Sequence, residues 1–406
     1  MRTFERLRSL LKSDRGNALM IAAGTLPLMM ASAGFAVDTI YLGVLKRQMQ
    51  RAADSSALAG AYALSQEASA PNAVTRDLTK NKFPTLAQAQ QVTVGPSLGY
   101  TQTVRVQLRT TPGLPFMTMF TKAPAVVTSD ATAAIVHSGE FCVLSLYNGT
   151  NPGIDVGGNA VLNLGCGLAS NSTGSNAINA FGSSSVTASP IMGVGGLSGS
   201  TNYTGTTKLQ PYSAEQTDPF SYVQNPPPQT CSNSEQVKPA DPTKTLSPGC
   251  YGSLDIDGSA NLQPGTYYIN GGDLKFGAQA KVTGNGVTFV MTGPGGAAGD
   301  LDMNGQADLN LSAPGSGDYK DILFYRDRRA GNTEIKINGG AEMALKGALY
   351  FPSSDVTFTG NAGFSATCFQ MVGQILTFRG TATINNSCSD YDKLPTFRLK
   401  FIRLVQ

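Results

Sequence analysis

The chain has 406 residues, of which 46 are Gly, and only 14% are Asp, Glu, Lys or Arg, compared with roughly 25% in ordinary soluble domains. This length allows about two or three domains with a sizeable core, and the low charge together with abundant Gly indicates a largely β protein outside the cytoplasm. A net charge of +3, without a basic stripe interleaved with aromatic residues, argues against nucleic acid as a partner.

The N-terminus predicts a membrane anchor. Residues 1–16 form a basic segment with five basic and two acidic side chains, and the 21 residues of 17–37 carry no charge, enough for a transmembrane helix. The basic cluster predicts a cytoplasmic amino end, with everything after the helix outside. A cleaved signal peptide is the alternative, since Ala31-Ser32-Ala33 has the A-x-A form. Retention is favoured because apolar residues continue past that site, to Val37 and beyond Asp38.

Residues 38–137 are predicted to form a pilin-like domain, with a helix over about 40–68 packed on a small sheet. Period-two patterns at 91–94, 103–108 and 125–135 predict the strands, and an apolar plug at 114–120 lies between the last two. The helix carries two rows of small residues at i,i+4 spacing. These rows suit the close approach of another helix or a sheet, and they also occur in ordinary Ala-rich helices. Their members are Ala52, Ser56 and Gly60, and Ala53, Ala57 and Ala61.

Several motifs in this N-terminal region resemble a known family. They are R-G-N-A-L-M at 15, Pro27, G-F-A-V-D at 34 and Q-R-A-A-D-S-S-A-L-A-G-A at 50. Over residues 12–65 the chain resembles TadG-type proteins, in the TadE/TadG-like group of the Tad (Flp) pilus assembly systems of bacteria. The resemblance rests on Arg15, Gly16, Pro27, Val37, Asp38, Gln50, Ala52, Ala53, Asp54, Ala57, Leu58 and Ala59.

The resemblance implies an inner-membrane protein with its bulk in the periplasm, tied to the assembly or anchoring of an adhesive pilus. Two features depart from the family. The metal-binding D-x-S-x-S motif of longer relatives is absent from the sequence, since Asp54-Ser55-Ser56 has the wrong spacing. The fifth residue after Gly16 is Ile21 instead of the Glu that prepilin peptidase substrates carry, so that cleavage is not expected.

A nine-residue phrase recurs seven times, starting at 154, 254, 274, 301, 335, 356 and 376. Positions one, three and nine are apolar, position five is Gly except at Ala278, and position seven is always Ala. Odd positions are predicted to point inward along a strand that Gly ends at a corner. A coil of about 20 residues predicts a right-handed parallel β-helix over 138–393. The inward Ala residues are Ala160, Ala260, Ala280, Ala307, Ala341, Ala362 and Ala382.

Six cysteines, all beyond residue 140, indicate disulfides in an oxidising compartment, with buried free thiols as the alternative. Cys368 and Cys388 each lie twelve residues after the start of consecutive copies of the phrase, which places them at one corner of adjacent coils and within disulfide range. Cys166 also lies twelve residues after a start, at Ile154, and its expected partner is Cys142, one coil earlier. The predicted pairs are Cys368 with Cys388, Cys142 with Cys166, and Cys231 with Cys250.

Two segments depart from the repeat. Residues 196–250 are rich in Ser, Thr and Pro, which predicts a long insertion that leaves the solenoid and folds over one face. Residues 394–406 are apolar and basic, and they are predicted to cap the last coil, because an open solenoid end needs covering.

One charged cluster is the best catalytic candidate. We interpret it as a solvated turn beside the buried strand 322–325. The Asp pairs at 255/257 and 300/302 could bind calcium only weakly, and no recurrent ligand pattern supports such a site. Without a histidine in this region, nucleophile–His chemistry is excluded. No catalysis, cofactor or metal is therefore expected. The cluster comprises Asp318, Asp321, Arg326, Asp327, Arg328 and Arg329.

The sequence thus predicts a single-pass membrane protein with a pilin-like stalk and a β-helical head in the periplasm or at the cell surface. Its expected role is structural, in pilus assembly or adhesion. The expected partners are the inner membrane, other Tad proteins or pilins, and surface polysaccharide. The alternative is a membrane-tethered β-helix that binds or cleaves carbohydrate.

Overall fold

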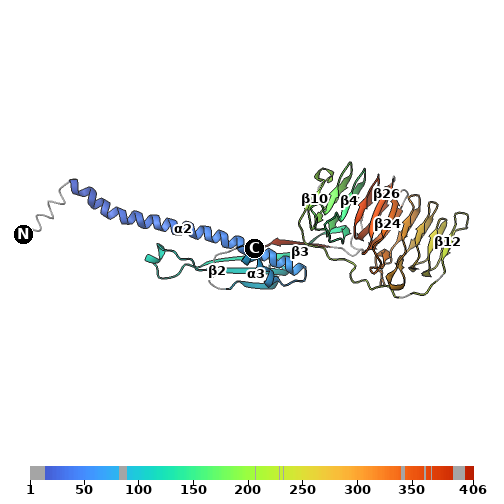
Figure 1. Cartoon of the computed structure of the whole chain (residues 1–406), viewed down its shortest axis with the longest axis horizontal. Coiled ribbons are helices and arrows are strands. Elements are labelled where there is room, and N and C mark those ends of the chain that lie inside the picture. Colours follow the sequence, from blue (N-terminus) through green and yellow to red (C-terminus); the bar gives the residue numbers. More distant parts are fainter. Residues whose placement is uncertain are drawn as a thin grey trace, which may run out of the picture. The chain divides into compact units, whose positions relative to one another are not determined.

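The computed structural model describes residues 14–81, 89–205, 207–227, 229–231, 233–339, 343–360, 363–366, 368–386 and 398–406. It is mainly β, with one long N-terminal helix and parallel sheets (Figure 1). The chain divides into two units. The first is Met1–Val136 with Ile402–Gln406, and the second is His137–Phe401. Each unit has a hydrophobic core of its own.

In the first unit, helices pack on an antiparallel sheet. Strand β1 pairs with β2, and β2 pairs with β3, which continues into the second unit. Ser69 caps the second helix and Pro71 lies in its first turn, while Val74 and Leu78 face the core. The elements are α2 (Asp14–Ser65), α3 (Ala70–Lys80), β1 (Gln91–Ser97), β2 (Tyr100–Thr110), η1 (Met117–Met119) and β3 (Val127–Ser145).

The predicted membrane segment and the predicted stalk helix form one continuous helix, α2, which runs through Pro27 without a break. Its first half exposes large apolar side chains such as Leu28 and Met29, and its second half buries small ones. By length and composition, Met20–Ser65 is the one candidate membrane span in the described part of the chain.

In the second unit, all seven repeats contribute one strand to the same parallel sheet. Their first residues are in register, as Leu254 with Leu274 and Leu274 with Leu301. Within the described residues this sheet has ten strands. They are β4 (Ile154–Val156), β7 (Ile178–Ala180), β10 (Leu197–Ser198), β12 (Glu235–Val237), β15 (Leu254–Ile256), β18 (Leu274–Phe276), β21 (Leu301–Met303), β24 (Glu334–Gly339), β26 (Asp355–Gly360) and β29 (Leu376–Phe378).

The remaining strands of the second unit also pair in parallel with the strand one repeat away. They are β5 (Val161–Leu164), β6 (Gly167–Ser170), β8 (Ser185–Thr187), β9 (Ile191–Gly193), β11 (Leu209–Gln210), β13 (Lys244–Leu246), β14 (Gly249–Tyr251), β16 (Ser259–Leu262), β17 (Gly265–Asn270), β19 (Lys281–Asn285), β20 (Val287–Thr292), β22 (Asp308–Ser312), β23 (Ile322–Arg326), β25 (Met343–Phe351), β27 (Gly363–Ala366), β28 (Cys368–Gly373) and β30 (Thr383–Asn386).

The order of these strands is not the order of the chain. The last strands pair with the first: β28 with β3, β29 with β4, and β30 with β5. The ten-stranded sheet therefore runs β10-β7-β4-β29-β26-β24-β21-β18-β15-β12. The chain enters this sheet in the middle and builds one end as far as β10. It then crosses to β12 at the opposite end and returns to the middle.

This order corrects the predicted insertion at 196–250. Those residues include β10 and β11 near one end of the stack and β12, β13 and β14 near the other. Residues 211–234, which we call the crossing segment, contain no strand where they are described. The Pro-rich composition suits this segment because Pro cannot donate to a strand ladder.

Apolar side chains fill the interior of the second unit. Five of the seven repeat Ala residues are buried at 4% exposure or less: Ala160, Ala260, Ala280, Ala307 and Ala382. Ala341 and Ala362 lie outside the described residues. At position five of the repeat, the corner where the strand ends, Gly158 and Gly380 have positive φ angles of 73° and 74°. A Cβ on Gly158 would lie 3.0 Å from the carbonyl oxygen of Gly380, so the corner requires Gly.

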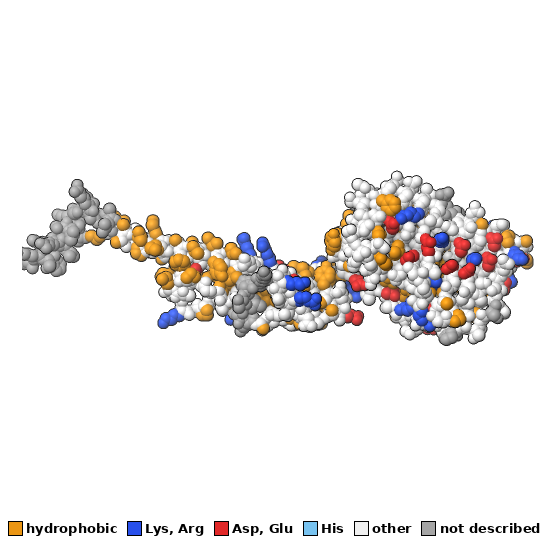
Figure 2. All heavy atoms as spheres, in the orientation of Figure 1, with side chains coloured by type: hydrophobic (Ala, Val, Ile, Leu, Met, Phe, Trp, Pro, Cys, Tyr) orange, Lys and Arg blue, Asp and Glu red, His pale blue; other side chains and the backbone are white. Residues whose placement is uncertain are grey.

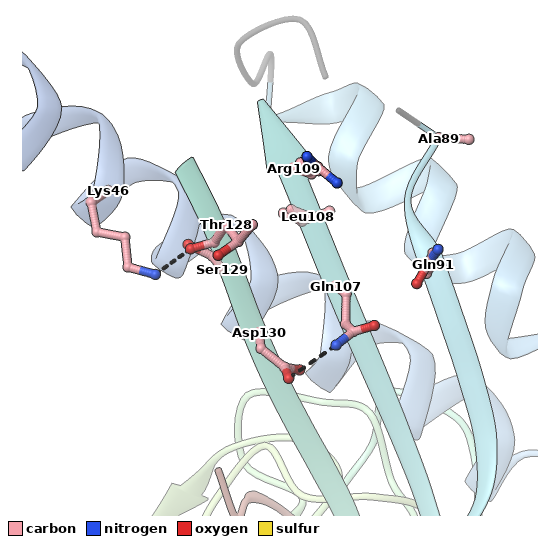
Figure 3. A pocket seen from close by; sticks show the side chains of 9 residues that line it. All are labelled: Lys46, Ala89, Gln91, Gln107, Leu108, Arg109, Thr128, Ser129 and Asp130. Atoms are coloured by element: carbon pink, nitrogen blue, oxygen red, sulfur yellow. Dashed lines mark hydrogen bonds between the residues drawn. The ribbon is translucent and has the colours of Figure 1, made fainter. Parts of the chain in front are cut away.

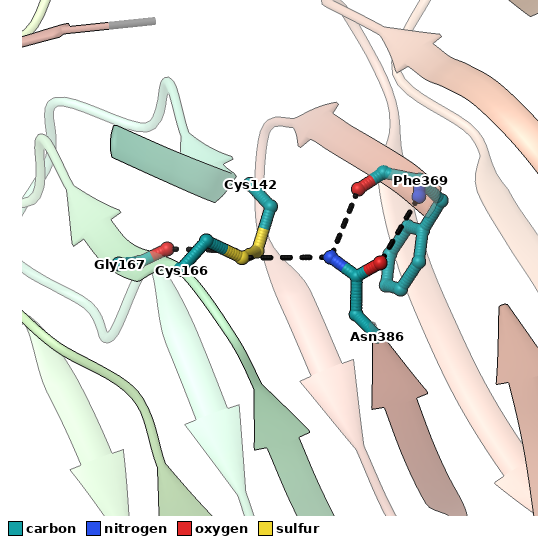
Figure 4. The surroundings of a disulfide bond; sticks show 5 residues. All are labelled: Cys142, Cys166, Gly167, Phe369 and Asn386. Atoms are coloured by element: carbon teal, nitrogen blue, oxygen red, sulfur yellow. Dashed lines mark hydrogen bonds between the residues drawn. A yellow bond between two sulfur atoms is a disulfide. The ribbon is translucent and has the colours of Figure 1, made fainter. Parts of the chain in front are cut away.

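Two predicted disulfides are present. Cys142 and Cys166 are joined, with their Cα atoms 5.8 Å apart, and so are Cys231 and Cys250 at 5.6 Å. Beside the first disulfide, the amide of Asn386 donates to Cys166 Sγ and to the Phe369 carbonyl oxygen (Figure 4). These contacts join the first strands of the unit to the last.

The C-terminus differs from the predicted cap at 394–406. Within that range the structure describes 398–406, where Arg398–Leu404 form strand β31, and Ile402–Gln406 belong to the first unit. There the backbone N–H of Val405 donates to the carbonyl oxygen of Thr132, and the N–H of Thr132 donates to Gln406. These residues therefore extend the sheet of the first unit along β3.

Replacing Ala307 by Leu is expected to destabilise the second unit by about 1–3 kcal/mol, because the larger side chain must enter a packed interior. The adjacent exposed change Asp308→Asn is the matched control, and it should cost less than about 0.5 kcal/mol. Thermal unfolding of the full chain, followed by circular dichroism, compares the two. Equal tolerance of both substitutions would show that position seven does not face the core.

A third disulfide between Cys368 and Cys388 is also expected. Cys368 is buried and disulfide-bonded, and Cys388 lies outside the described residues. By the chain-entropy argument, a link over this short loop stabilises the protein by about 3 kcal/mol. Peptide mapping without reduction identifies the partner. A link from Cys368 to any other cysteine contradicts the shared repeat phase.

Candidate functional site

A buried carboxylate connects the end of the predicted membrane segment to the apolar plug. Asp38 is only 2% exposed. Its Oδ2 accepts hydrogen bonds from the backbone N–H groups of Phe116, at 3.1 Å, and Met117, at 2.6 Å. These donors lie at the start of the short helix η1, where backbone N–H groups have no partner within the helix. The carboxylate therefore fixes the plug against α2.

The contact also explains Gly34, one turn before Asp38 on the same face of α2. A Cβ at Gly34 would lie 2.3 Å from a ring carbon of Phe116, so only Gly lets the plug approach. Next to it, the rings of Phe35 and Phe120 are 5.0 Å apart. The G-F-A-V-D motif is thus the docking surface for the plug within this chain.

The small-residue rows of α2 pack inside the first unit. The four Ala residues and Ser56 are fully buried in a core shared with Val104, Val106 and Ala131. A Cβ on Gly60 would lie 2.8 Å from Val104 and 2.9 Å from Val74. The rows therefore allow α2 to lie close to α3 and to the chain's own sheet, and the buried face is not available to a partner.

The other family-motif residues are divided between core and surface. Pro27 and Val37 lie on the exposed part of α2, and Leu58 and Ala59 are half-buried. Arg15 and Gly16 lie in the first turn of α2, before the residues whose burial is described. Gln50 donates to Asp54 at 2.8 Å and to the carbonyl oxygen of Asp130 at 3.0 Å, so it ties α2 to β3.

A polar pocket of about 360 Å³ lies beside this contact (Figure 3). Lys46 donates to the Thr128 carbonyl oxygen, and Gln107 donates to the Asp130 carboxylate at 3.3 Å. Hydrogen bonds from Arg105 hold the pKa of Asp130 below its usual range. Arg105 and Asp130 were not among the residues that the sequence singled out. The signal was their position on the solvent face of two alternating strands, where opposite charges pair across neighbouring strands.

The charged cluster of the second unit is not the solvated turn that the sequence predicted. Arg326 and Asp327 are at most 1% exposed. The Arg326 guanidinium donates to the carbonyl oxygens of Ala298, Gly299 and Gly331 and to Ser354. Ala298, Gly299 and Ser354 lie 27 or 28 residues away from Arg326, so the arginine joins segments that are distant in the sequence. The run of charges in the sequence gave no indication of these hydrogen bonds.

Asp327 is bound in the same manner. It accepts hydrogen bonds from Thr292 at 2.7 Å and from the backbone and side chain of Arg329. Burial alone would raise the pKa of Asp327, but these hydrogen bonds outweigh it and hold the pKa below its usual range. Asp318 remains exposed. Because the Arg326 guanidinium and the Asp327 carboxylate form their hydrogen bonds with other parts of the fold, this pair has a structural role.

Two arginines of the cluster hold the crossing segment. Arg328 donates to the carbonyl oxygens of Phe220 and Val223, each at 3.1 Å, and to the hydroxyl of Tyr350. Arg329 donates to the carbonyl oxygen of Pro226 at 3.4 Å. Phe220 is fully buried and its ring lies 5.0 Å from that of Tyr350. The crossing segment is therefore packed onto the sheet.

Asp321 differs from its neighbours in the cluster. It has a positive φ of 64°, and burial raises the pKa of its carboxyl group. It lies in a pocket of about 240 Å³ that shares Asn285, Ser312 and Lys346 with a groove of about 420 Å³. The groove adds Asn261, Thr283 and Asn310, so it is lined mainly by amide and hydroxyl groups. Such a surface offers hydrogen bonds to a polar ligand.

Within the described ranges, no group of three or more His, Cys, Asp or Glu side chains is placed to hold a metal ion.

Comparison with known proteins identifies one segment of the chain. Residues 16–63 match the family model described as putative Flp pilus-assembly TadE/G-like, as the sequence resemblance predicted. No curated protein and no solved structure is similar enough to the chain to count as a match. The matched residues are those of α2 that carry Gly34, Asp38 and the small-residue rows.

Asp38→Ala is expected to release the plug. The substitution leaves two backbone N–H groups without their charged acceptor, a loss of about 1.5–3 kcal/mol. Hydrogen–deuterium exchange of the detergent-solubilised full chain should show the amides of Phe116 and Met117 exchanging about tenfold faster or more. Thr39→Ala, at the adjacent exposed position, is the control and should leave both rates unchanged. Unaltered exchange in Asp38→Ala would mean that the carboxylate does not hold the plug.

Proposed function

We propose that this chain is a non-enzymatic, membrane-anchored component of a Tad (Flp) pilus assembly or adhesion system. The observation that carries the proposal is the structure of the matched segment, residues 16–63. It is a single helix with an exposed apolar first half and a second half buried on a sheet. A helix of this kind combines a membrane anchor with a stalk. Its expected partners are the inner membrane and other Tad proteins or pilins.

The proposed topology is a cytoplasmic amino end over 1–16, a membrane span over 17–37 and a pilin-like stalk domain over 38–137, with the rest of the chain in the periplasm or at the surface. The five basic residues before the span support this orientation. The disulfides support an oxidising compartment for the second unit.

The second unit is proposed to be a parallel β-helical head over 138–393. The in-register pairing of successive repeats from 254 to 376, and of the repeat at 376 with the one at 154, supports this architecture, as does the burial of the described repeat Ala residues. A structural role for the head is supported by its most charged cluster, because Arg326, Asp327 and Arg328 bind the fold itself.

The second candidate function is carbohydrate binding or cleavage by this head. The amide- and hydroxyl-lined groove that leads to Asp321 favours it. Hydrolysis of a glycosidic bond commonly uses two carboxylates, and Asp321 is the one carboxylate among the described residues that line the groove and its adjoining pocket. The groove therefore favours binding over cleavage.

Genetic complementation tests the structural proposal. Deleting the gene in the parent bacterium is expected to reduce pili, counted by electron microscopy, and attachment to surfaces. Both the unaltered chain and the variant Asp321→Asn should restore them, because no carboxyl chemistry is required. Asn tolerates the positive φ at this position, so the fold should be kept.

Two outcomes oppose the proposal. Normal pili and attachment in the deletion strain would remove the chain from pilus assembly and adhesion. If Asp321→Asn folds but fails to restore attachment, and the purified chain loses a polysaccharide-cleaving activity with the same substitution, the head is an enzyme.

A further inference from the structure

The plug loop, residues 111–126 between β2 and β3, exposes large apolar side chains. Met119 is 78% exposed, Phe120 62% and Phe116 39%. The loop carries a single charge, at Lys122. Isolated apolar residues are common on protein surfaces, but three in one short loop form a patch that suits an apolar partner. Figure 2 shows hydrophobic side chains along the exposed part of α2 and on the first unit beside it.

The position of the loop along α2 identifies that partner. The loop contacts Gly34, Phe35 and Asp38, at the end of the uncharged run 17–37. The exposed side of the helix stays apolar beyond this point through Ile40 to Val44. From Met20 to Val44 this apolar side extends about 36 Å at 1.5 Å per residue, slightly more than the roughly 30 Å of bilayer hydrocarbon.

The first exposed charges after the span are Lys46 and Arg47. Lys46 lies eight positions, or about 12 Å along the helix axis, beyond Asp38. Asp38 is the only charge between Arg15 and Lys46, and a bare carboxylate at this depth would cost several kcal/mol. The two backbone donors of the plug loop cover it instead. The loop therefore lies where the hydrocarbon meets the headgroups.

We propose that the plug loop inserts into the leaflet that faces the second unit's compartment, with a phospholipid bilayer as its partner. Met119, Phe120 and Phe116 lie in the outer acyl region. Lys122 extends to the lipid phosphates, as amphipathic side chains do at a membrane surface. The inference rests on the membrane anchoring by α2 proposed above, and it adds a second, shallow attachment that fixes the rotation of the helix about its axis.

Tryptophan fluorescence tests this directly, because the chain contains no Trp. The variants Met119→Trp, Met29→Trp and Tyr62→Trp of the full chain are reconstituted into phosphatidylcholine vesicles brominated either high in the acyl chains or near their ends. Met29 lies within the span and is 70% exposed. Tyr62 is on the same helix, about 36 Å beyond Asp38. Met119 is so exposed that the substitution should not disturb folding, and circular dichroism verifies this.

Bromine high in the acyl chains should quench Met119→Trp to an extent comparable with the quenching of Met29→Trp by deep bromine. Tyr62→Trp should keep its fluorescence in both vesicles. Quenching of Met29→Trp without quenching of Met119→Trp overturns the inference and leaves the anchoring intact. If emission of Met119→Trp then shifts to the blue as protein density in the vesicles rises, the loop binds a second copy instead of lipid. Absence of quenching at both positions overturns the anchoring itself.

Discussion

Two of the charges that this sparsely charged chain buries, Asp38 and Arg326, are bound mainly by backbone groups of distant segments, and those bonds hold irregular parts of the chain in place. Asp38 accepts from the amides of the plug loop, 78 and 79 residues away. Arg326 donates to the carbonyl oxygens of Ala298 and Gly299, 28 and 27 residues away, and Arg328 donates to the crossing segment. Because an unpaired buried charge is so costly, each of these groups excludes conformations in which its loop is released.

The strand order of the second unit follows from a different property, the chemical equivalence of its repeats. Any repeat can pair in parallel with any other, since each presents the same ladder of backbone groups and the same apolar positions. What selects the observed order is the chain between the repeats. The crossing segment has its own buried anchor, Phe220, and its own bonds to Arg328 and Arg329. It therefore stabilises the strand order in which the last strands pair with the first and Asn386 contacts Cys166.

The equivalence of the repeats also explains what the sequence could and could not predict. Period-two alternation and the repeat phase predict which residues of the repeats face inward, and the phase predicts the pair Cys142–Cys166, which leaves Cys231 to pair with Cys250. They contain no information on which equivalent repeats become neighbours, so the pairing of β29 with β4 was missed. The burial of Arg326 was missed because a run of charges in a sequence resembles a surface turn. Its acceptors lie up to 28 residues away and are mostly backbone atoms, which leave no trace in side-chain patterns.

The first unit shows how one helix can carry both a candidate membrane span and a scaffold for a sheet. Its buried small residues bring α2 close to Val104 and Val74, so the helix continues from the candidate span into the core without a hinge. Since α3 and the chain's own sheet cover that face, it is closed to any other protein. The polar pocket around Lys46 and Asp130 lies on a different surface of the helix and sheet. Its lining mixes charges of both signs with amide and hydroxyl groups, so this surface stays polar where the buried face of the helix is apolar.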